Sequence, residues 1–483
     1  MKKKLSMLLA LAMAVTMTGC SGGGREEKAS DDVTLIYCVA GNQQADEVEV
    51  EAAINEIIQP LIGAKIDLQF IDWAAYKEKM NMKLTAGEYF DIAYGGFDRV
   101  TATKNGALMA LDDLLEQYAK ELKEELPQYM WDAATTDGKI YCVPNYQCMA
   151  YPKGVAVRKD LMEKYNFDIT KVKKLGDLEP FWQQIRDNEP TLIPYRMQNL
   201  ETFTADALGE DFAYTGKVDS LLYINWDDCK VYTSLDSDVM YKKAKVAYDW
   251  MQKGYFRKDI ATVADDSSDY ASGRYATFSL GYKPGCEAEY KTATGYDYVI
   301  QVVGESMVDD TQPTSTTTVM SADTKYPEQA MQFLNLLNTN KDIYNLICFG
   351  IEGKHYKWVD DEHIQVDNQS GYCPNSSWEF GNQFNAYVQV GQDVDVWEKT
   401  IKQNEDARVT PIMGIKFENS EILTQLTQCK KIQKEYCVAR MEKGVTDPDS
   451  YWEQYLAELK KAGIEDVKAH YQRTIDEHLE KKK

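Results

Sequence analysis

The first hundred residues alternate between short apolar runs and segments whose apolar side chains recur with the period of a helix. This pattern predicts strands at 32–40, 64–71 and 89–96 and helices at 47–58 and 76–85. Pro60 is predicted to end the first of these helices. Strands that alternate with helices are typical of a parallel β-sheet, in which ligands gather at the carboxyl ends of the strands. The loops at 42–46 and 95–99 follow two such ends.

A β-prone stretch at 137–146 opens on the turn dipeptide Asp137-Gly138 and is interrupted by Pro144, which cannot continue a central strand. A new block of helical pattern starts at Arg158. We therefore place the first crossing between two lobes in this stretch. The second crossing is expected at 296–303, followed by a strand at 314–321 in the first lobe, and the third near 323–325.

The chain has 483 residues, of which 44% are hydrophobic, and this length is too great for one hydrophobic core. We predict an α/β fold of two lobes. The N-terminal lobe is expected to comprise 32–142 plus 299–324. The C-terminal lobe is expected to comprise 143–298 plus 325–483 and to end in a helical extension, because the C-terminal third has helical periodicity throughout.

The N-terminus has the features of a bacterial signal peptide. Lys2, Lys3 and Lys4 precede an apolar run at 5–18 that is too short to span a bilayer permanently. The run ends at Cys20, in a stretch that resembles a lipobox whose first position is Met17. Residues 1–20 are predicted to be the signal and Cys20 the lipidated residue, with 21–31 as a flexible tether. An ordinary cleaved secretion signal is the alternative.

The formal charge of −23 argues against nucleic acid or an anionic membrane surface as a partner. The ten cysteines and four histidines are scattered and contain no zinc-binding spacing, so no metal or other cofactor is expected. The sequence contains no G-x-S-x-G or H-E-x-x-H pattern, and histidines are scarce. A binding protein is therefore expected rather than an enzyme.

Five stretches of the chain together resemble the extracellular solute-binding lipoproteins of bacterial ABC importers, of the maltodextrin-binding type. More narrowly they are similar to the LipO or LplA-like branch of Gram-positive bacteria, which carries a C-terminal domain of unknown function. The similar stretches lie at 137–147, 325–337, 349–356, 378–384 and 451–463.

This resemblance implies a two-lobed periplasmic-binding-protein fold of class II, with three crossings at a hinge and closure around one ligand. It also implies that the protein is a monomer, anchored by lipid on the extracellular face of the cytoplasmic membrane. The implied partners are a sugar ligand, the permease subunits and, through them, the ATPase. In this class the ligand is usually an oligosaccharide.

A sugar site needs aromatic faces for stacking and amide, carboxylate or guanidinium groups for paired hydrogen bonds. The resemblance assigns Asp98 and Arg99 to the loop after the third strand, and Tyr282 to an aromatic position of the second lobe. Each candidate also has a structural reading, as a loop ion pair, a hinge contact or a core aromatic. The predicted ligand-binding residues are Gln43, Gln44, Asp98, Arg99, Asn145, Tyr146, Gln147, Trp226, Tyr282, Trp378, Asn382 and Gln383.

Two alternatives remain open from the sequence. The same fold could bind a peptide or another neutral metabolite, which would need charged anchors for the peptide ends. A secreted glycosidase would need two carboxylates held roughly 5–10 Å apart, and 77 acidic residues make such pairs uninformative.

Overall fold

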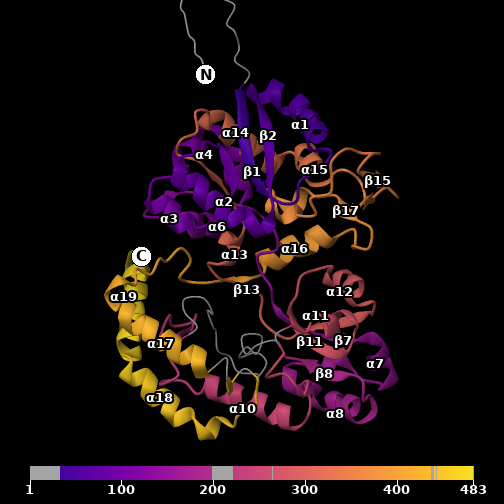
Figure 1. The fold of residues 1–483 in the computed structure, drawn as a ribbon, viewed down its shortest axis with the longest axis vertical. Helices are drawn as coiled ribbons and strands as arrows, with labels where there is room; N and C mark the ends of the chain where they lie inside the picture. The colour runs from indigo at the N-terminus through magenta and orange to yellow at the C-terminus, as the bar shows by residue number, and fades with distance from the viewer. Residues whose placement is uncertain (1–32, 198–220, 264, 437–439, 442, 482–483) are drawn as a thin grey trace, which may run out of the picture.

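The computed structural model describes residues 33–197, 221–263, 265–436, 440–441 and 443–481 (Figure 1). These residues form two lobes, each with its own β-sheet and hydrophobic core, and Figure 1 shows them one above the other. The predicted signal, Cys20 and the tether lie outside the described residues. The two-lobed α/β architecture is the one that the sequence predicted.

The sheet of the first lobe has five strands in the order β2-β1-β3-β14-β6. Strands β1, β2 and β3 run parallel, whereas β14 is antiparallel to both β3 and β6. Strand β6 therefore runs in the direction of β1, and the chain leaves its carboxyl end for the second lobe. The carboxyl ends of β1, β2 and β3 consequently lie at the edge that faces the second lobe. The strands are β1 (Val33–Ala40), β2 (Ala64–Ile71), β3 (Ile92–Tyr94), β6 (Val143–Pro144) and β14 (Thr317–Met320).

Helices cover both faces of this sheet and bury its apolar side chains. Helix α1 continues past Pro60 and ends at Gly63, whose left-handed backbone (φ 66°) closes the helix. The expected stop at Pro60 was therefore wrong. The helices are α1 (Glu47–Ile62), α2 (Trp73–Ala86), α3 (Arg99–Lys104), α4 (Asp112–Tyr118), α5 (Lys120–Glu125), α6 (Gln128–Ala134), α13 (Gln312–Ser315), α14 (Pro327–Thr339), α15 (Lys341–Phe349) and α16 (Val396–Glu405).

Two small sheets complete the first lobe. The hairpin of β4 (Thr135–Thr136) and β5 (Lys139–Ile140) follows α6, and a three-stranded sheet lies beside α15 in Figure 1. The strands of the latter are β15 (Tyr356–Trp358), β16 (His363–Val366) and β17 (Val388–Gln389).

The second lobe is built on the sheet β12-β7-β11-β8, in which β7 is antiparallel to both neighbours and β11 is parallel to β8. Its core is rich in aromatic side chains, with Trp182 fully buried against Tyr195 and Trp250. The strands and helices are β7 (Lys153–Arg158), β8 (Ile193–Arg196), β11 (Tyr275–Gly281), β12 (Tyr298–Val302), α7 (Lys159–Lys164), α8 (Glu179–Asn188), α10 (Val239–Gln252), α11 (Ser267–Ala271), α12 (Cys286–Thr294), α17 (Leu423–Tyr436), α18 (Trp452–Lys461) and α19 (Ile464–Lys481).

The packing corrects the predicted lobe boundaries. Helix α14 packs on α4 and α5, and Phe333 belongs to the same core as Tyr37 of β1. Residues 327–405 therefore lie in the first lobe, not the second, and the crossing expected near 323–325 is wrong. Thr324 instead donates to the buried carboxylate of Asp91 within the first lobe. Strand β12 belongs to the second sheet, and β6 to the first.

Helix α16 fastens the segment that joins β6 to β7. The amide oxygen of Asn404 accepts from the backbone amides of Met149, at 2.8 Å, and Ala150, at 3.2 Å. Its amide nitrogen donates to the carbonyl of Gln147 at 2.8 Å. Asn404 is 2% exposed, so these backbone groups have no water to replace it. One side chain thus fixes the path of the chain between the lobes.

Replacing Asn404 by Ala should lower the free energy of unfolding by about 2–4 kcal/mol, because it removes the partner of three backbone groups, two of them in fully buried residues. The exposed neighbour Lys402 is the matched control, since its ion pair with Asp406 lies at the surface and Lys402→Ala should cost less than about 1 kcal/mol. Urea unfolding of both variants checks this. Equal stabilities for the two would contradict the role given to Asn404.

Candidate functional site

Three aromatic side chains meet at the edge of the first sheet that faces the second lobe. Trp73 follows the end of β2, Tyr94 ends β3, and Trp378 comes from the short 3-10 helix η3 (Ser377–Glu379). The Trp73 and Trp378 ring centroids lie 5.4 Å apart, and Tyr94 packs edge-on against both. Trp73 is nevertheless 41% exposed. This aromatic cluster therefore offers an apolar ring face to the space between the lobes.

Arg99 lies beside the cluster because Gly95 leaves room for it. A Cβ atom at Gly95 would come within 2.8 Å of Arg99 Cδ and 2.2 Å of Thr317 Oγ1. The guanidinium donates from Nη2 to the carbonyl of Thr314 at 2.6 Å and from Nη1 to Cys142 Sγ at 3.4 Å. These bonds hold Arg99 in place at the end of β3.

Asp98 points elsewhere. Its carboxylate caps α3 and accepts from the backbone amide of Thr101 at 3.2 Å. Hydrogen bonds from Thr101 lower the pKa of Asp98 below its ordinary value. The residue borders a separate cavity of about 240 Å³ between α2 and α3. The expected pairing of Asp98 with Arg99 in one site is therefore not found.

A larger cavity, of about 560 Å³, is bordered by Arg99 and by further residues of both lobes. The first lobe contributes α3, the end of α6 and the β4–β5 hairpin region. The second lobe contributes the segment 415–419 and one residue of α19. Its charged and aromatic lining residues include Arg99, Tyr141, Asp310, Lys416, Phe417 and Tyr471. This volume is in the range of small-molecule sites.

A buried acid fixes the segment that carries Trp378. Glu379 is fully buried, and its Oε1 accepts from the amide of Ala40, at the end of β1, at 2.6 Å. Its other oxygen has no hydrogen-bond partner. Burial raises the pKa of Glu379 from 4.5 to about 8, so the carboxyl group carries a proton at neutral pH. Trp378 is thus joined to the strand ends by a contact across 339 residues of sequence.

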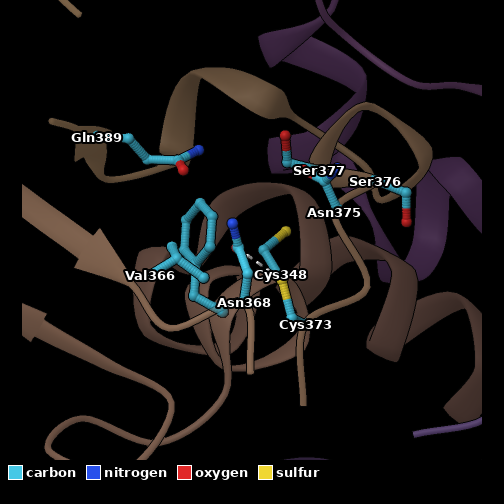
Figure 2. A pocket seen from close by; sticks show the side chains of 9 residues that line it. Cys348, Val366, Asn368, Cys373, Asn375, Ser376, Ser377 and Gln389 are labelled. Atoms are coloured by element: carbon cyan, nitrogen blue, oxygen red, sulfur yellow. Dashed lines mark hydrogen bonds between the residues drawn. The ribbon is translucent and has the colours of Figure 1, made fainter. Parts of the chain in front are cut away.

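A further cavity lies where this segment meets β16 and β17 (Figure 2). Figure 2 shows Cys348, Cys373, Asn368 and Gln389 around it, with the Cys373 thiol directed at the amide oxygen of Asn368. Its volume of about 30 Å³ is enough for one or two water molecules. A sugar ring does not fit, so the cavity beside Arg99 is the better candidate.

Four predicted residues form a buried junction within the first lobe. Asn145 is fully buried and donates to the carbonyl of Glu379, and Tyr146 packs edge-on against Phe384 with ring centroids 4.7 Å apart. Asn382 donates to Glu125, and the Gln383 backbone amide donates to the Tyr146 carbonyl at 2.7 Å. The polar groups named here form hydrogen bonds within the protein.

The other predicted residues are dispersed. Gln44 accepts from the amide of Cys373, Gln43 donates to Glu47, and Gln147 donates to Thr316. Trp226, also a predicted ligand contact, is 4% exposed within the second core. The Tyr282 ring is half-buried against a small cluster around Phe278. A ligand contact by these residues stays a prediction.

Sequence reasoning missed Trp73, Tyr94, Tyr141, Lys416, Phe417 and Tyr471. The first two were within reach, because they end β2 and β3 and ligand loops follow strand ends. The last three come from the C-terminal domain, and the sequence alone gave no sign that this domain reaches the cavity beside Arg99.

Among the described residues, no group of His, Cys, Asp or Glu is arranged to hold a metal ion. Every helix in the described ranges is too short or too polar to span a bilayer.

Comparison with known proteins identifies the class. The profile of the bacterial extracellular solute-binding proteins matches residues 45–343, and a domain of unknown function, DUF3502, matches 411–480. The chain therefore belongs to the bacterial extracellular solute-binding proteins, which are binding proteins and not enzymes.

Individual relatives agree with this assignment. The chain is 26% identical to a carbohydrate ABC transporter substrate-binding protein of Streptococcus pneumoniae, over 98% of this chain and 97% of the relative. The crystal structure of the N-glycan transport solute-binding protein NgtS of that species superposes with a TM-score of 0.81 at 24% identity, covering 94% of this chain and all of NgtS. Its fructooligosaccharide-binding protein FusA, in complex with kestose, gives 0.59 at 17% identity, over 92% and 99%.

The raised pKa of Glu379 predicts a stability that depends on pH. An unfolded glutamate loses its proton near pH 4.5, whereas the folded protein keeps it to about pH 8. The folded state therefore binds one more proton in this window, and Glu379 lowers the stability as the pH rises from 4.5 to 8.

Glu379→Gln keeps an oxygen for the Ala40 amide and removes this titration. Thermal unfolding should show equal stability at pH 5 and a more stable variant at pH 8, by about 4 kcal/mol at most. The exposed Glu362→Gln is the control, and a variant that follows the wild type at both pH values would contradict the buried proton.

Proposed function

We propose that this protein captures a neutral oligosaccharide outside the cell and delivers it to the permease of a carbohydrate ABC importer. The observation that carries the proposal is the aromatic cluster of Trp73, Tyr94 and Trp378 at the strand ends, in which the Trp73 ring is 41% exposed. Arg99, which follows Tyr94 closely in the chain, borders a cavity with walls from both lobes. Sugar rings present C–H faces that stack on such aromatic side chains.

The polar groups that border the cavity suit hydroxyl groups rather than a charged ligand. Three basic side chains (Arg99, Lys104, Lys416) and three acidic ones (Asp137, Asp310, Glu418) border the cavity. Their formal charges cancel, and together they offer both donors and acceptors. A neutral polyhydroxylated ligand matches this balance better than an anionic one.

The ligands of related proteins support a carbohydrate ligand. NgtS has been crystallised with Man1GlcNAc and Man5GlcNAc, and FusA with kestose. At these sequence identities the likeness supports the fold, and the choice of a sugar rests on the aromatic cluster and on the carbohydrate-transport relative.

Capture is proposed to work by closure of the two lobes. The chain passes between the cores after β6, after β12 and after α16, and we infer that these three connections form a hinge. A ligand that contacts both lobes binds the closed state more tightly and shifts the population toward it. The closed form would then be the one that the permease recognises.

Substitution of the exposed tryptophan tests the ligand site. Trp73→Ala should weaken binding of a neutral oligosaccharide roughly tenfold, because a stacked ring contributes about 1 kcal/mol or more. Trp358 of β15 is the matched control, since it is similarly exposed, at 39% against 41%, but lies outside the aromatic cluster. Isothermal titration calorimetry with Man1GlcNAc, Man5GlcNAc, kestose and neutral gluco-oligosaccharides, beside short peptides, checks both variants. Binding of a peptide, or the same loss in both variants, would contradict the proposal.

We further propose that Cys20 carries the lipid anchor that keeps the protein at the extracellular face of the membrane, where it acts as a monomer. Two acyl chains on one residue suffice for stable attachment, and residues 21–31 would give the folded part a flexible tether.

Replacing Cys20 by Ser should release the protein into the medium, because serine cannot form the thioether that holds the lipid. Fractionation of cells that express either form, with incorporation of labelled palmitate as a second readout, measures this. A serine variant that stays with the membrane would exclude the anchor.

A further inference from the structure

The C-terminal domain comprises residues 411–480. Its first residues lie between the two lobes. Met413 belongs to the first core, whereas Ile412 and Ile415 belong to the second. Gly414 adopts a left-handed backbone (φ 82°), and a Cβ atom there would lie 2.6 Å from the carbonyl oxygen of Asp132 in α6. Only glycine permits so close an approach. The domain is therefore held against the first lobe at the margin of the cavity.

Two polar contacts hold the next residues of this segment across the cavity. Lys416 Nζ donates to the carbonyl of Ala133 at 3.3 Å, and Lys104 of α3 pairs with Glu418 at 3.0 Å. The Lys104–Glu418 pair is exposed and contributes little energy, but both contacts place 416–418 opposite α3. The domain thus reaches over the cavity at two points.

The domain also supplies the aromatic surface of the cavity wall. Phe417 stacks on Tyr471 of α19, with ring centroids 4.5 Å apart and planes inclined by 26°. Both residues border the cavity, and Tyr141 lines it from the first lobe. Tyr141 and Trp378 pack against one apolar cluster, to which Tyr94 also belongs.

Arg99 connects the two regions. Its side chain passes over Gly95 at the end of β3, directly after Tyr94 of the aromatic cluster, and its residue also borders the cavity. A ligand stacked on Trp73 and Trp378 and extended past Arg99 would enter this cavity. The region beyond Arg99 is thus a continuation of the ligand site, with walls from a different domain.

We propose that the C-terminal domain forms a subsite for the far units of a long oligosaccharide, with Lys416, Phe417 and Tyr471 as its wall, and that it sets the preference for chain length. This inference rests on the proposed function. It assigns to residues 411–480 a direct role in choosing the ligand. A short sugar held by the aromatic cluster does not need the subsite, whereas a longer one does.

Filling the cavity separates long from short ligands. Thr103 of α3 borders the cavity, and Thr103→Trp should place an indole in the space for the far sugar units. We expect affinity for the longest sugar that the wild type binds to fall at least tenfold, and affinity for the shortest to change less than twofold. Man5GlcNAc and Man1GlcNAc are the first pair to compare by calorimetry. Asn105→Trp, at the end of the same helix but on the smaller cavity beside Asp98, is the matched control and should change neither.

A second variant covers the case in which the indole disturbs folding. Lys416→Ala removes one hydrogen bond to the Ala133 carbonyl and should lower the melting temperature only slightly. It should weaken only the long sugar, by roughly three- to tenfold for one lost charged hydrogen bond. Equal losses for long and short sugars, or no loss for either, would overturn the subsite. Those results would leave the proposed function intact if Trp73→Ala still weakens oligosaccharide binding. A wild-type protein that binds no oligosaccharide at all would overturn both.

Discussion

The candidate site depends on one buried contact, between the carboxyl group of Glu379 and the backbone amide of Ala40 at the end of β1. Parallel strands bring Trp73 and Tyr94 to the same edge of the sheet, but the third ring comes from a segment more than 280 residues later in the chain. That segment carries Trp378, and its neighbour Glu379 is anchored in the interior beside the strand ends. A carboxyl group in this apolar surrounding keeps its proton, which avoids the cost of a buried charge. The aromatic cluster therefore exists because a neutral acid joins two distant parts of the sequence.

The same junction links the ligand face to the connection between the lobes. Asn145 donates to the carbonyl of Glu379, and Gln383 donates to Tyr146, so the first residues after β6 are bonded to the segment that carries Trp378. Asn404 then fixes the next residues of this connection. Residues that the sequence suggested as ligand contacts thus build the support of the site. The connection between the lobes and the segment that carries Trp378 are therefore bonded to each other.

Local patterns explain how much of the fold could be predicted. The alternation of strands and helices in residues 33–94 predicts the parallel sheet, and the loop at 95–99 follows β3 as expected. A ligand contact by Arg99 stays a prediction. The lobe boundaries failed because helices α14 and α15 have the same amphipathic pattern whichever core they cover, and only tertiary packing decides between them. The capping role of Asp98 was not predicted for a related reason, since an aspartate before a helix suits a cap as well as a ligand contact. Residues 415–419 and Tyr471 reach the cavity wall only because of how the two lobes pack together. Local sequence patterns do not predict that packing.

The position of the bound ligand tests the proposed site most directly. A crystal structure of the protein with a bound neutral oligosaccharide would show that position. Our account predicts a sugar ring stacked on Trp73 or Trp378, hydrogen bonds from Arg99, and further units in contact with Phe417 or Tyr471 of the opposite lobe. A sugar bound on one lobe only, or at a site away from the aromatic cluster, would contradict it.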